Sequence, residues 1–287
     1  PPNSEELQQI LFAGLSQFWQ ATAMHRRLDM LVEQYWAAKR EKSKNPLLKY
    51  GEKFFSQHDE DGILLEICKR IRLTRGVFVE IGVGNGLENN SLILLMNGWQ
   101  GVWLGAEPLA FDVPDSGPLL FQQAWVTRET CSALVTHGLT ALGQGQPNVL
   151  SVDIDGNDLY VVEAIIASGI SPDIVICEYN AKFPPPIRWS INYDPAHSWD
   201  GSDYQGVSLQ LLVDVLGKYD YRLVACNVTG SNAFFVLNRH AGDFDDVPRS
   251  AAELFMAADY NWFFGRGHAT SPRTIAGFLK PNGNEPE

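Results

Sequence analysis

The chain has 287 residues, of which 45% are hydrophobic, and a formal net charge of −12. This length and hydrophobic content are enough for one large core, so a single α/β domain with added elements is the simplest organisation. A surface this acidic repels phosphate groups, which argues against nucleic-acid and membrane partners and favours a small molecule.

The first predicted element is helical and covers residues 4–44, where apolar residues recur at helical spacing. We expect residues 1–50 to form a helical cap that lies on a core beginning later in the chain. These helices also offer a surface through which a homo-oligomer could form.

The predicted core begins near Ser56, which we expect to cap a helix that starts with the acidic run Asp59 to Asp61. Strands and helices then alternate, which is typical of a doubly wound parallel sheet. The predicted strands are 77–81, 101–106, 119–126, 148–154 and 173–179, and the helices between them are about 90–98, 129–142 and 158–168.

A further helix near 206–218 precedes two apolar runs, 221–226 and 232–237, which a short glycine turn joins into an antiparallel hairpin. The predicted fold is therefore a Rossmann-like α/β fold with a mostly parallel central sheet, a terminal antiparallel hairpin and N-terminal helices. Class I methyltransferases have this strand plan. The main domain is expected over residues 51–240 and an accessory segment over 241–287.

The cysteines predict a reducing environment. They lie far apart in apolar runs and form no Cys-x-x-Cys pair, so neither a zinc site nor a disulfide framework is indicated. The sequence also contains no signal peptide and no membrane-spanning apolar run, and we therefore expect a cytoplasmic protein. The four residues are Cys68, Cys131, Cys177 and Cys226.

A glycine-rich loop, Glu80-Ile81-Gly82-Val83-Gly84-Asn85-Gly86, follows the first predicted strand. Glycines let a backbone turn sharply and approach a ligand closely. Position 87 is Leu, so the spacing of a dinucleotide loop fails, and no Gly-Lys-Ser/Thr of a phosphate-binding loop follows. The acid Glu80 suits the positive charges of S-adenosylmethionine (SAM).

Two further residues fit a SAM site. Glu107 ends the next strand, about 20 residues after the glycine loop, where a carboxylate can accept both ribose hydroxyls. Trp125 ends the third strand and either stacks on the adenine or belongs to the core. We assign these residues, together with Gln57, Asn90, Asp153 and the loop residues Gly82, Gly84, Asn85 and Gly86, to the cofactor.

At this point the sequence resembles the FkbM-like methyltransferase family. Beside the glycine loop, the motifs that carry the resemblance are Phe55-Ser56-Gln57, Glu60-Asp61-Gly62, Asn90-Ser91, Gly98-Trp99-Gln100-Gly101, Glu107-Pro108 and the run from Ser151 to Asp158. Some positions depart from the family pattern: Glu80 replaces Asp, Val83 replaces Ala, and Asp155 and Asp158 replace glutamates. The resemblance implies SAM binding and O-methyl transfer, and it leaves the acceptor undetermined.

Oxygen-bearing side chains follow the fourth and fifth strands, namely Asp153, Asp155, Glu178 and Asn180. Ligands of open α/β sheets sit at the carboxyl ends of the strands. One carboxylate, Asp153, could be a general base, or the four residues could bind Mg²⁺ or Ca²⁺. Asp155 and its neighbour Asp158 could instead cap the following helix.

The loop 181–205 is long and aromatic, and long loops in compact domains are commonly functional. We expect it to form the wall against which the methyl acceptor binds. Its His197 is a second candidate base, although a lone loop histidine can equally be structural.

The leading hypothesis is a SAM-dependent methyltransferase acting on a small-molecule hydroxyl of a natural product or sugar. An N- or C-methyltransferase and a non-catalytic SAM-binding assembly protein are the alternatives. A nicotinamide oxidoreductase is disfavoured by the glycine spacing.

Overall fold

The computed structural model describes residues 4–259, 272, 275–276 and 279, and it places the side chains from residue 12 onward. Most of the chain after residue 259 therefore lies outside the described residues, and with it more than half of the segment expected to be accessory. Residues 241–259 pack on the core, where the Arg222 guanidinium donates to the carbonyls of Ala241, Phe244 and Val247.

A mixed seven-stranded sheet forms the centre of the described molecule, with the strand order β3-β2-β1-β4-β5-β7-β6. Strands β1 to β5 are parallel, and β7 runs antiparallel to both β5 and β6. The mostly parallel sheet with a terminal hairpin is confirmed. The bounds are β1 Val77–Ile81, β2 Gln100–Gly105, β3 Leu119–Gln123, β4 Val149–Val152, β5 Ile174–Glu178, β6 Tyr221–Cys226 and β7 Asn232–Leu237.

Strand ends differ from the predicted ones where the partner strand runs out. Strand β3 was predicted to continue to residue 126, but it is an edge strand whose only ladder, with β2, ends at the pair Gly105 and Gln123. The residues that follow leave the sheet and become part of a cavity wall. Strand β1 and both strands of the hairpin have the predicted bounds.

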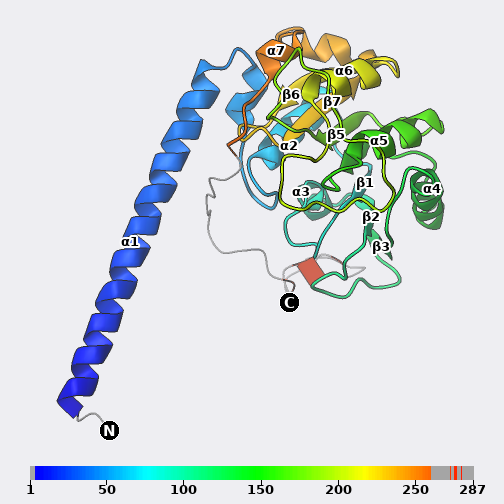
Figure 1. Cartoon of the computed structure of the whole chain (residues 1–287). Coiled ribbons are helices and arrows are strands. Elements are labelled where there is room, and N and C mark those ends of the chain that lie inside the picture. The colour runs from blue at the N-terminus through cyan, green and yellow to red at the C-terminus, as the bar shows by residue number, and fades with distance from the viewer. Residues whose placement is uncertain (1–3, 260–271, 273–274, 277–278, 280–287) are drawn as a thin grey trace.

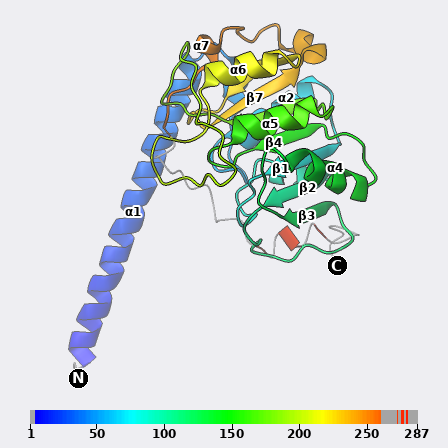
Figure 2. The ribbon, with the colours of Figure 1, turned by 45° about the vertical axis from the view of Figure 1, so that its right-hand side comes forward.

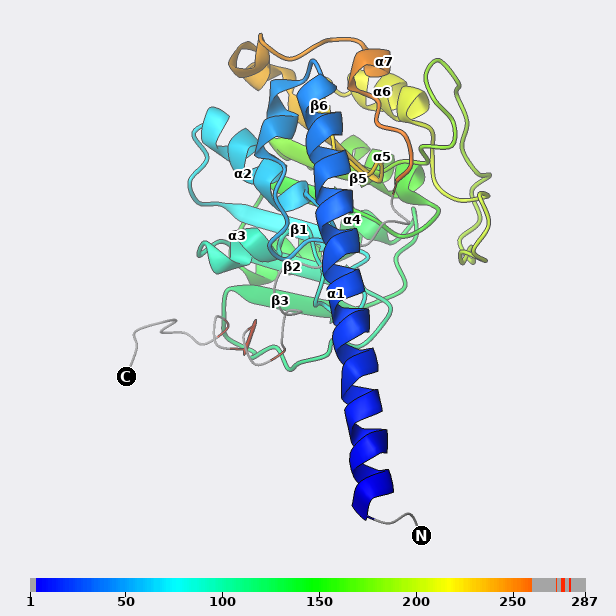
Figure 3. The same cartoon turned by 90° about the vertical axis from the view of Figure 1, so that its left-hand side faces the viewer.

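Helices cover both faces of the sheet. Helix α4 contacts β2 and β3, α5 contacts β4 and β5, and α6 contacts β6, so these three lie side by side on one face (Figure 2). Helices α2 and α3 lie on the opposite face (Figure 3). The bounds are α2 Glu60–Arg70, α3 Leu92–Met96, α4 Cys131–Ala141, α5 Asp158–Ala167, α6 Leu209–Gly217 and α7 Ala251–Leu254, with short 3-10 helices at Pro46–Tyr50 and Asn238–Phe244.

The N-terminal element is a single long helix, α1 Ser4–Lys42, which projects away from the core (Figure 1). The prediction of a cap lying on the core was wrong, because Val32 and Trp36 are the buried residues among the described side chains of this helix. Large apolar side chains are exposed along the described part of this helix, from residue 12 to residue 35. These are Phe12, Leu15, Phe18, Trp19, Met24, Leu28, Met30, Leu31 and Tyr35.

Only the last turns of α1 are fixed to the core. Lys39 donates to the carbonyls of Val228 and Ala257, and Arg40 pairs with Asp59 at 3.1 Å. A helix that is apolar on several sides is usually buried against a partner. Self-association through α1 therefore stays a prediction. No helix in the described part of the chain has both the length and the apolar character that crossing a bilayer requires.

Candidate functional site

The strand register brings the predicted site residues to one edge of the sheet. Ile81 pairs with Leu104 and with Val152, and Val152 pairs with Cys177. The residues that come next in each strand, Gly82, Gly105, Asp153 and Glu178, therefore lie along the carboxyl edge of four neighbouring strands. Two adjoining cavities open along this edge.

The glycine loop turns away from the sheet at Gly82, whose φ is +91°. Its amide donates to the Leu104 carbonyl at 2.9 Å, and a Cβ atom at this position would lie 1.5 Å from the Asp153 carbonyl oxygen. Only glycine meets both demands, the left-handed backbone and the close approach of β4. Gly82 lines both cavities, and because it has no side chain, its backbone forms part of the wall of each.

Glu80, predicted to meet the cofactor, is buried and holds the start of α3 after the glycine loop. Its carboxylate accepts the backbone amides of Asn90 and Ser91, each at 2.9 Å, and the Ser91 hydroxyl as well. Trp103 fixes that hydroxyl by donating to it at 2.8 Å. Burial raises the pKa of Glu80 above its usual value. Glu80 and Asn90 nevertheless both line the second cavity.

The first cavity has a volume of about 190 Å³ and lies over the ends of β1 to β4. Two of the predicted cofactor residues, Glu107 and Trp125, stand in its wall. The Trp125 ring is 54% exposed, so it does not belong to the core, and its indole N–H donates to the Pro195 carbonyl at 2.7 Å. Other lining residues are Ile81, Gly84, Gly105, Ala106, Ala124, Val126, Ile154, Asn157 and His197.

His197, a candidate base, lies in this first cavity rather than in the second. Its ring packs over the backbone of Gly156, where an added Cβ would come within 2.2 Å of the imidazole. Its buried Nε2 atom has no hydrogen-bond partner among the described residues. The structure thus places His197 in the wall of the cavity that Trp125 and Asp155 also line.

The second cavity has a volume of about 680 Å³ and shares Gly82, Asp153 and Asp155 with the first. The predicted residues Gln57, Glu80, Asn90, Glu178 and Asn180 stand in its wall. The 181–205 loop, predicted to form the acceptor wall, contributes Lys182, Trp199, Gly201, Ser202, Asp203 and Gln205. Residues that the sequence did not single out complete the cavity, namely Glu88, Asn89, Ser231 and Asn232.

Three carboxylates converge where the two cavities meet. Asp153, Asp155 and Glu178 each place an oxygen within 4.8 Å of the others. Burial and the neighbouring carboxylates raise the pKa of Asp153 and of Glu178 well above their usual values. The Oε2 atom of Glu178 has no hydrogen-bond partner among the described residues.

This donor set fits a hard divalent cation such as Mg²⁺ or Ca²⁺, which prefers carboxylate oxygens. The buried carboxylates need compensation, either by a cation or by the protons that their raised pKa values favour, because the lining lysine, Lys182, pairs with Asp203.

Two of the predicted polar residues have structural roles. Asp158 accepts the amides of Ile154 and Gly156, each at 2.8 Å, in the turn before α5. The prediction that Asp155 and Asp158 cap this helix was wrong, because α5 begins at Asp158 after Asn157 and no side chain caps it. Asn180 donates to the carbonyls of Asp203 and Gln205, and its amide oxygen accepts the Lys182 amide at 3.1 Å. We therefore leave Asn180 out of the ligand set and regard it as the residue that holds the loop.

The acidic run before α2 also proves structural. Ser56, predicted to cap α2, does not occupy the N-cap position, because the helix begins at Glu60 after Asp59. Its hydroxyl nevertheless accepts the first-turn amide of Asp61 at 3.3 Å. The Asp61 carboxylate in turn accepts the amides of residues 54, 55 and 56, which fixes the turn that presents Gln57 to the second cavity.

Glu60 and Asp59 fix the β6–β7 turn. The Glu60 carboxylate accepts from the side-chain amide of Asn227 at 2.6 Å and of Asn232 at 3.2 Å. Asp59 accepts the amide of Val228 at 3.0 Å. These two acids at the entry to the domain therefore support the β6–β7 turn, beside which Asn232 lines the second cavity.

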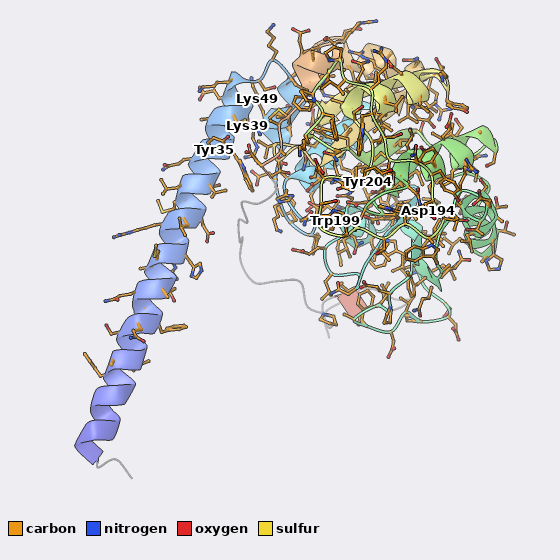
Figure 4. All side chains as sticks on the ribbon, viewed as in Figure 1. Tyr35, Lys39, Lys49, Asp194, Trp199 and Tyr204 are labelled. Carbon is orange, nitrogen blue, oxygen red and sulfur yellow. The ribbon has the colours of Figure 1, made fainter. Side chains whose placement is uncertain are left out.

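The 181–205 loop covers the site as predicted, and Asp194, Trp199 and Tyr204 from this loop lie together on one face of the core (Figure 4). Hydrogen bonds hold the loop at separate points, including Asn157 to the Asp194 carbonyl at 2.7 Å and Tyr160 to the Ile191 carbonyl at 2.7 Å. Trp199 lines the second cavity.

No family model matches the chain, and no curated protein matches it. One similar solved structure, titled "Conversion of a Disulfide Bond into a Thioacetal Group during Echinomycin Biosynthesis", is 13% identical and covers 72% of this chain and 92% of that chain, with a TM-score of 0.24. A similarity this low carries no argument about function, so any assignment depends on the site itself.

Proposed function

We propose that the chain is a SAM-dependent methyltransferase of FkbM-like type that methylates a hydroxyl group of a small molecule. The observation that carries this proposal is the pair of adjoining cavities that share the backbone of Gly82. One cavity contains Glu107 and Trp125, and the other contains the carboxylates Asp153 and Glu178. The strand order is also the one that class I methyltransferases use.

The first cavity suits the adenosine part of the cofactor. Glu107 follows β2, is exposed at the cavity wall and can accept both ribose hydroxyls. Trp125, held by its bond to the Pro195 carbonyl, offers a ring on which the adenine can stack. His197, with a free ring nitrogen in the same cavity, is better placed to contact the adenosine than to act as the base.

The second cavity would take the amino-acid part of the cofactor and the acceptor, which meet beside Gly82. SAM supplies a methyl group on a positively charged sulfur, so that transfer to a hydroxyl leaves S-adenosylhomocysteine and one proton. Asp153 and Asp155 line both cavities. Without a bound cation, Asp153 would be the carboxylate that receives that proton. The remaining contribution of the chain is alignment of the two reactants.

A divalent cation is part of this proposal. Asp153, Asp155 and Glu178 would hold it, and when bound it would lower the pKa of an acceptor hydroxyl. A metal favours a hydroxyl over an amine as acceptor, because hard cations prefer oxygen ligands. The rival assignment, a SAM-binding assembly protein without activity, would use α1 as its interface, but it leaves the gathered carboxylates without a role.

Replacing Glu107 with alanine tests the ribose contact. Loss of charge-assisted hydrogen bonds costs about 1.5–3 kcal/mol, so we expect the affinity for S-adenosylhomocysteine to fall at least about tenfold in titration calorimetry. Asp112→Ala is the matched control, since it removes an equally exposed carboxylate from the same connection outside either cavity. Equal affinities of the two variants would mean that the ribose is held elsewhere.

A further inference from the structure

The sequence of α1 places apolar and small residues in one seam along the helix. They recur at alternating intervals of three and four residues, with Gln17 as the exception, and from residue 14 onward all of these positions are exposed. Met24, Leu28 and Leu31 are 65%, 44% and 59% exposed. Large apolar side chains gathered on a surface in this way mark an interaction site. The α1 seam consists of Leu7, Ile10, Gly14, Gln17, Ala21, Met24, Leu28, Leu31, Tyr35 and Ala38.

The spacing of the α1 seam indicates what kind of surface covers it. A repeat of seven residues falls short of two turns of an α-helix, so the seam drifts about 20° around the helix with every heptad. A second helix follows such a winding seam by supercoiling with it. A membrane surface is flat, and the helices that lie on it carry many Lys and Arg residues on their polar face. From Leu7 to His25 the sequence has neither Lys nor Arg, so a helix is the partner that fits.

The charges of the chain favour a second copy as that partner. Helix α1 contains five acidic residues and five Lys or Arg residues, so the net charge of −12 lies on the rest of the chain. Two copies repel each other through their cores and approach most easily where charge is lacking. An antiparallel copy also brings the acidic beginning of one helix beside the basic end of the other and pairs opposite helix dipoles. The charged residues at the two ends are Glu5 and Glu6, and Lys39, Arg40, Glu41 and Lys42.

The sizes of the side chains in the α1 seam are complementary between antiparallel copies. When the two helices overlap along almost their whole length, Gly14 of one copy faces Leu31 of the other, and Ala21 faces Met24. A parallel pair in register would place Gly14 on Gly14 and Ala21 on Ala21, which leaves gaps. Glycine destabilises the interior of a helix relative to alanine, and no described atom lies within 4 Å of a Cβ at position 14. The described part of the chain thus does not require this glycine, whereas a facing Leu31 fills the space beside it.

We infer that two copies of this chain pair through the α1 seam as an antiparallel coiled coil with twofold symmetry. The helix has 39 residues and is about 58 Å long, so the two negatively charged cores lie at opposite ends of the pair. Val32 and Trp36, which are buried, lie outside the seam, and the free part of α1 stands away from the core (Figure 1). No residue of the seam lines either cavity, so this inference does not depend on the proposed function.

Light scattering of the full chain after size-exclusion chromatography tests the pairing. At micromolar concentration we expect twice the mass of one chain. We expect Met24→Glu to weaken the association at least about tenfold, because it places a charge inside the paired seam. Met30→Glu is the matched control, since Met30 is 60% exposed on the same helix but lies outside the seam, and its dimer should be unchanged. A monomeric wild-type chain, a larger oligomer or equal weakening by the two variants overturns the inference.

Cysteine cross-linking tests the orientation. The native cysteines are buried, so Gly14→Cys and Leu31→Cys each add an accessible thiol. The antiparallel pair places these two positions face to face and keeps each about 25 Å from the same position in the other copy. A mixture of the two variants should therefore form a disulfide between copies under mild oxidation, and neither variant should do so alone. Cross-linking of each variant to itself would show a parallel pair, and this result or the lack of a cross-link in the mixture refutes the antiparallel coiled coil.

Discussion

Replacing Asp153 with asparagine should abolish tight binding of a divalent cation. Its carboxylate is one of three that place oxygens within 4.8 Å of one another, and affinity for hard cations depends on the number of charged ligands. With Mn²⁺ as a spin probe for the Mg²⁺ site, we expect one bound ion per chain. We expect Asp153→Asn and Glu178→Gln each to weaken it at least about tenfold. Asp200→Asn, which changes the same charge on the 181–205 loop outside both cavities, is the control.

The same substitution should stabilise the metal-free protein. The raised pKa values of Asp153 and Glu178 mean that their ionised forms are less favourable in the folded chain than in water. Removing one charge relieves that repulsion, so the free energy of unfolding at neutral pH rises in EDTA and the stabilisation by Mg²⁺ disappears. Loss of stability in EDTA together with unchanged Mn²⁺ binding would show that the three carboxylates are a structural cluster.

Gly82→Ala should be among the most destabilising single substitutions in the core. The left-handed φ of +91° costs a residue with a Cβ about 1–3 kcal/mol, and the 1.5 Å approach of the Asp153 carbonyl forces β1 and β4 apart. Overpacking adds about 1–3 kcal/mol. We therefore expect a loss of about 3 kcal/mol or more in urea denaturation without ligand.

Gly84→Ala separates the two causes. Gly84 also has a positive φ, +49°, but nothing lies within 4 Å of a Cβ at that position. It should lose about 1 kcal/mol, the cost of the backbone conformation alone. Equal losses for the two variants would mean that the contact between Gly82 and Asp153 contributes nothing and that backbone strain is the whole effect.

The strands were predictable because local pattern and burial agree. The run Val77–Ile81 is apolar apart from Glu80 and is buried throughout, and the glycine loop ends it, so its bounds follow from the sequence. The glycines and Glu107 were identified for the same reason, since a strand end places them at a ligand edge in any parallel sheet. The β6–β7 hairpin was also predicted from local sequence patterns.

The part of the second cavity that Asn89, Ser231 and Asn232 form was not predictable in this way, because long-range pairing brings these residues to the site. Asn232 lies opposite Glu178 in the β5–β7 ladder, and Glu60 reaches Asn227 across 167 positions of sequence. The run Asp59 to Asp61 is the acidic start of α2, as predicted, but Asp59 and Glu60 also accept hydrogen bonds from the distant β6–β7 turn, which the sequence did not indicate. An amide facing a cavity has no sequence signature of its own.

The α1 prediction failed for a different physical reason. An apolar pattern in a helix shows that a face needs covering, but it does not say whether the core of the same chain covers it. Most of α1 extends away from the core, so the core does not cover the apolar residues that the pattern identified.

A thermal-shift comparison of S-adenosylhomocysteine with NAD tests the central claim most directly. Each ligand is added at high concentration to the full chain in Mg²⁺. A ligand at about 100 times its Kd stabilises the folded state by about 2.7 kcal/mol, which for a domain of this size raises the Tm by roughly 5–10 °C. We expect that rise with S-adenosylhomocysteine and none with NAD, and a rise with NAD alone would contradict the account.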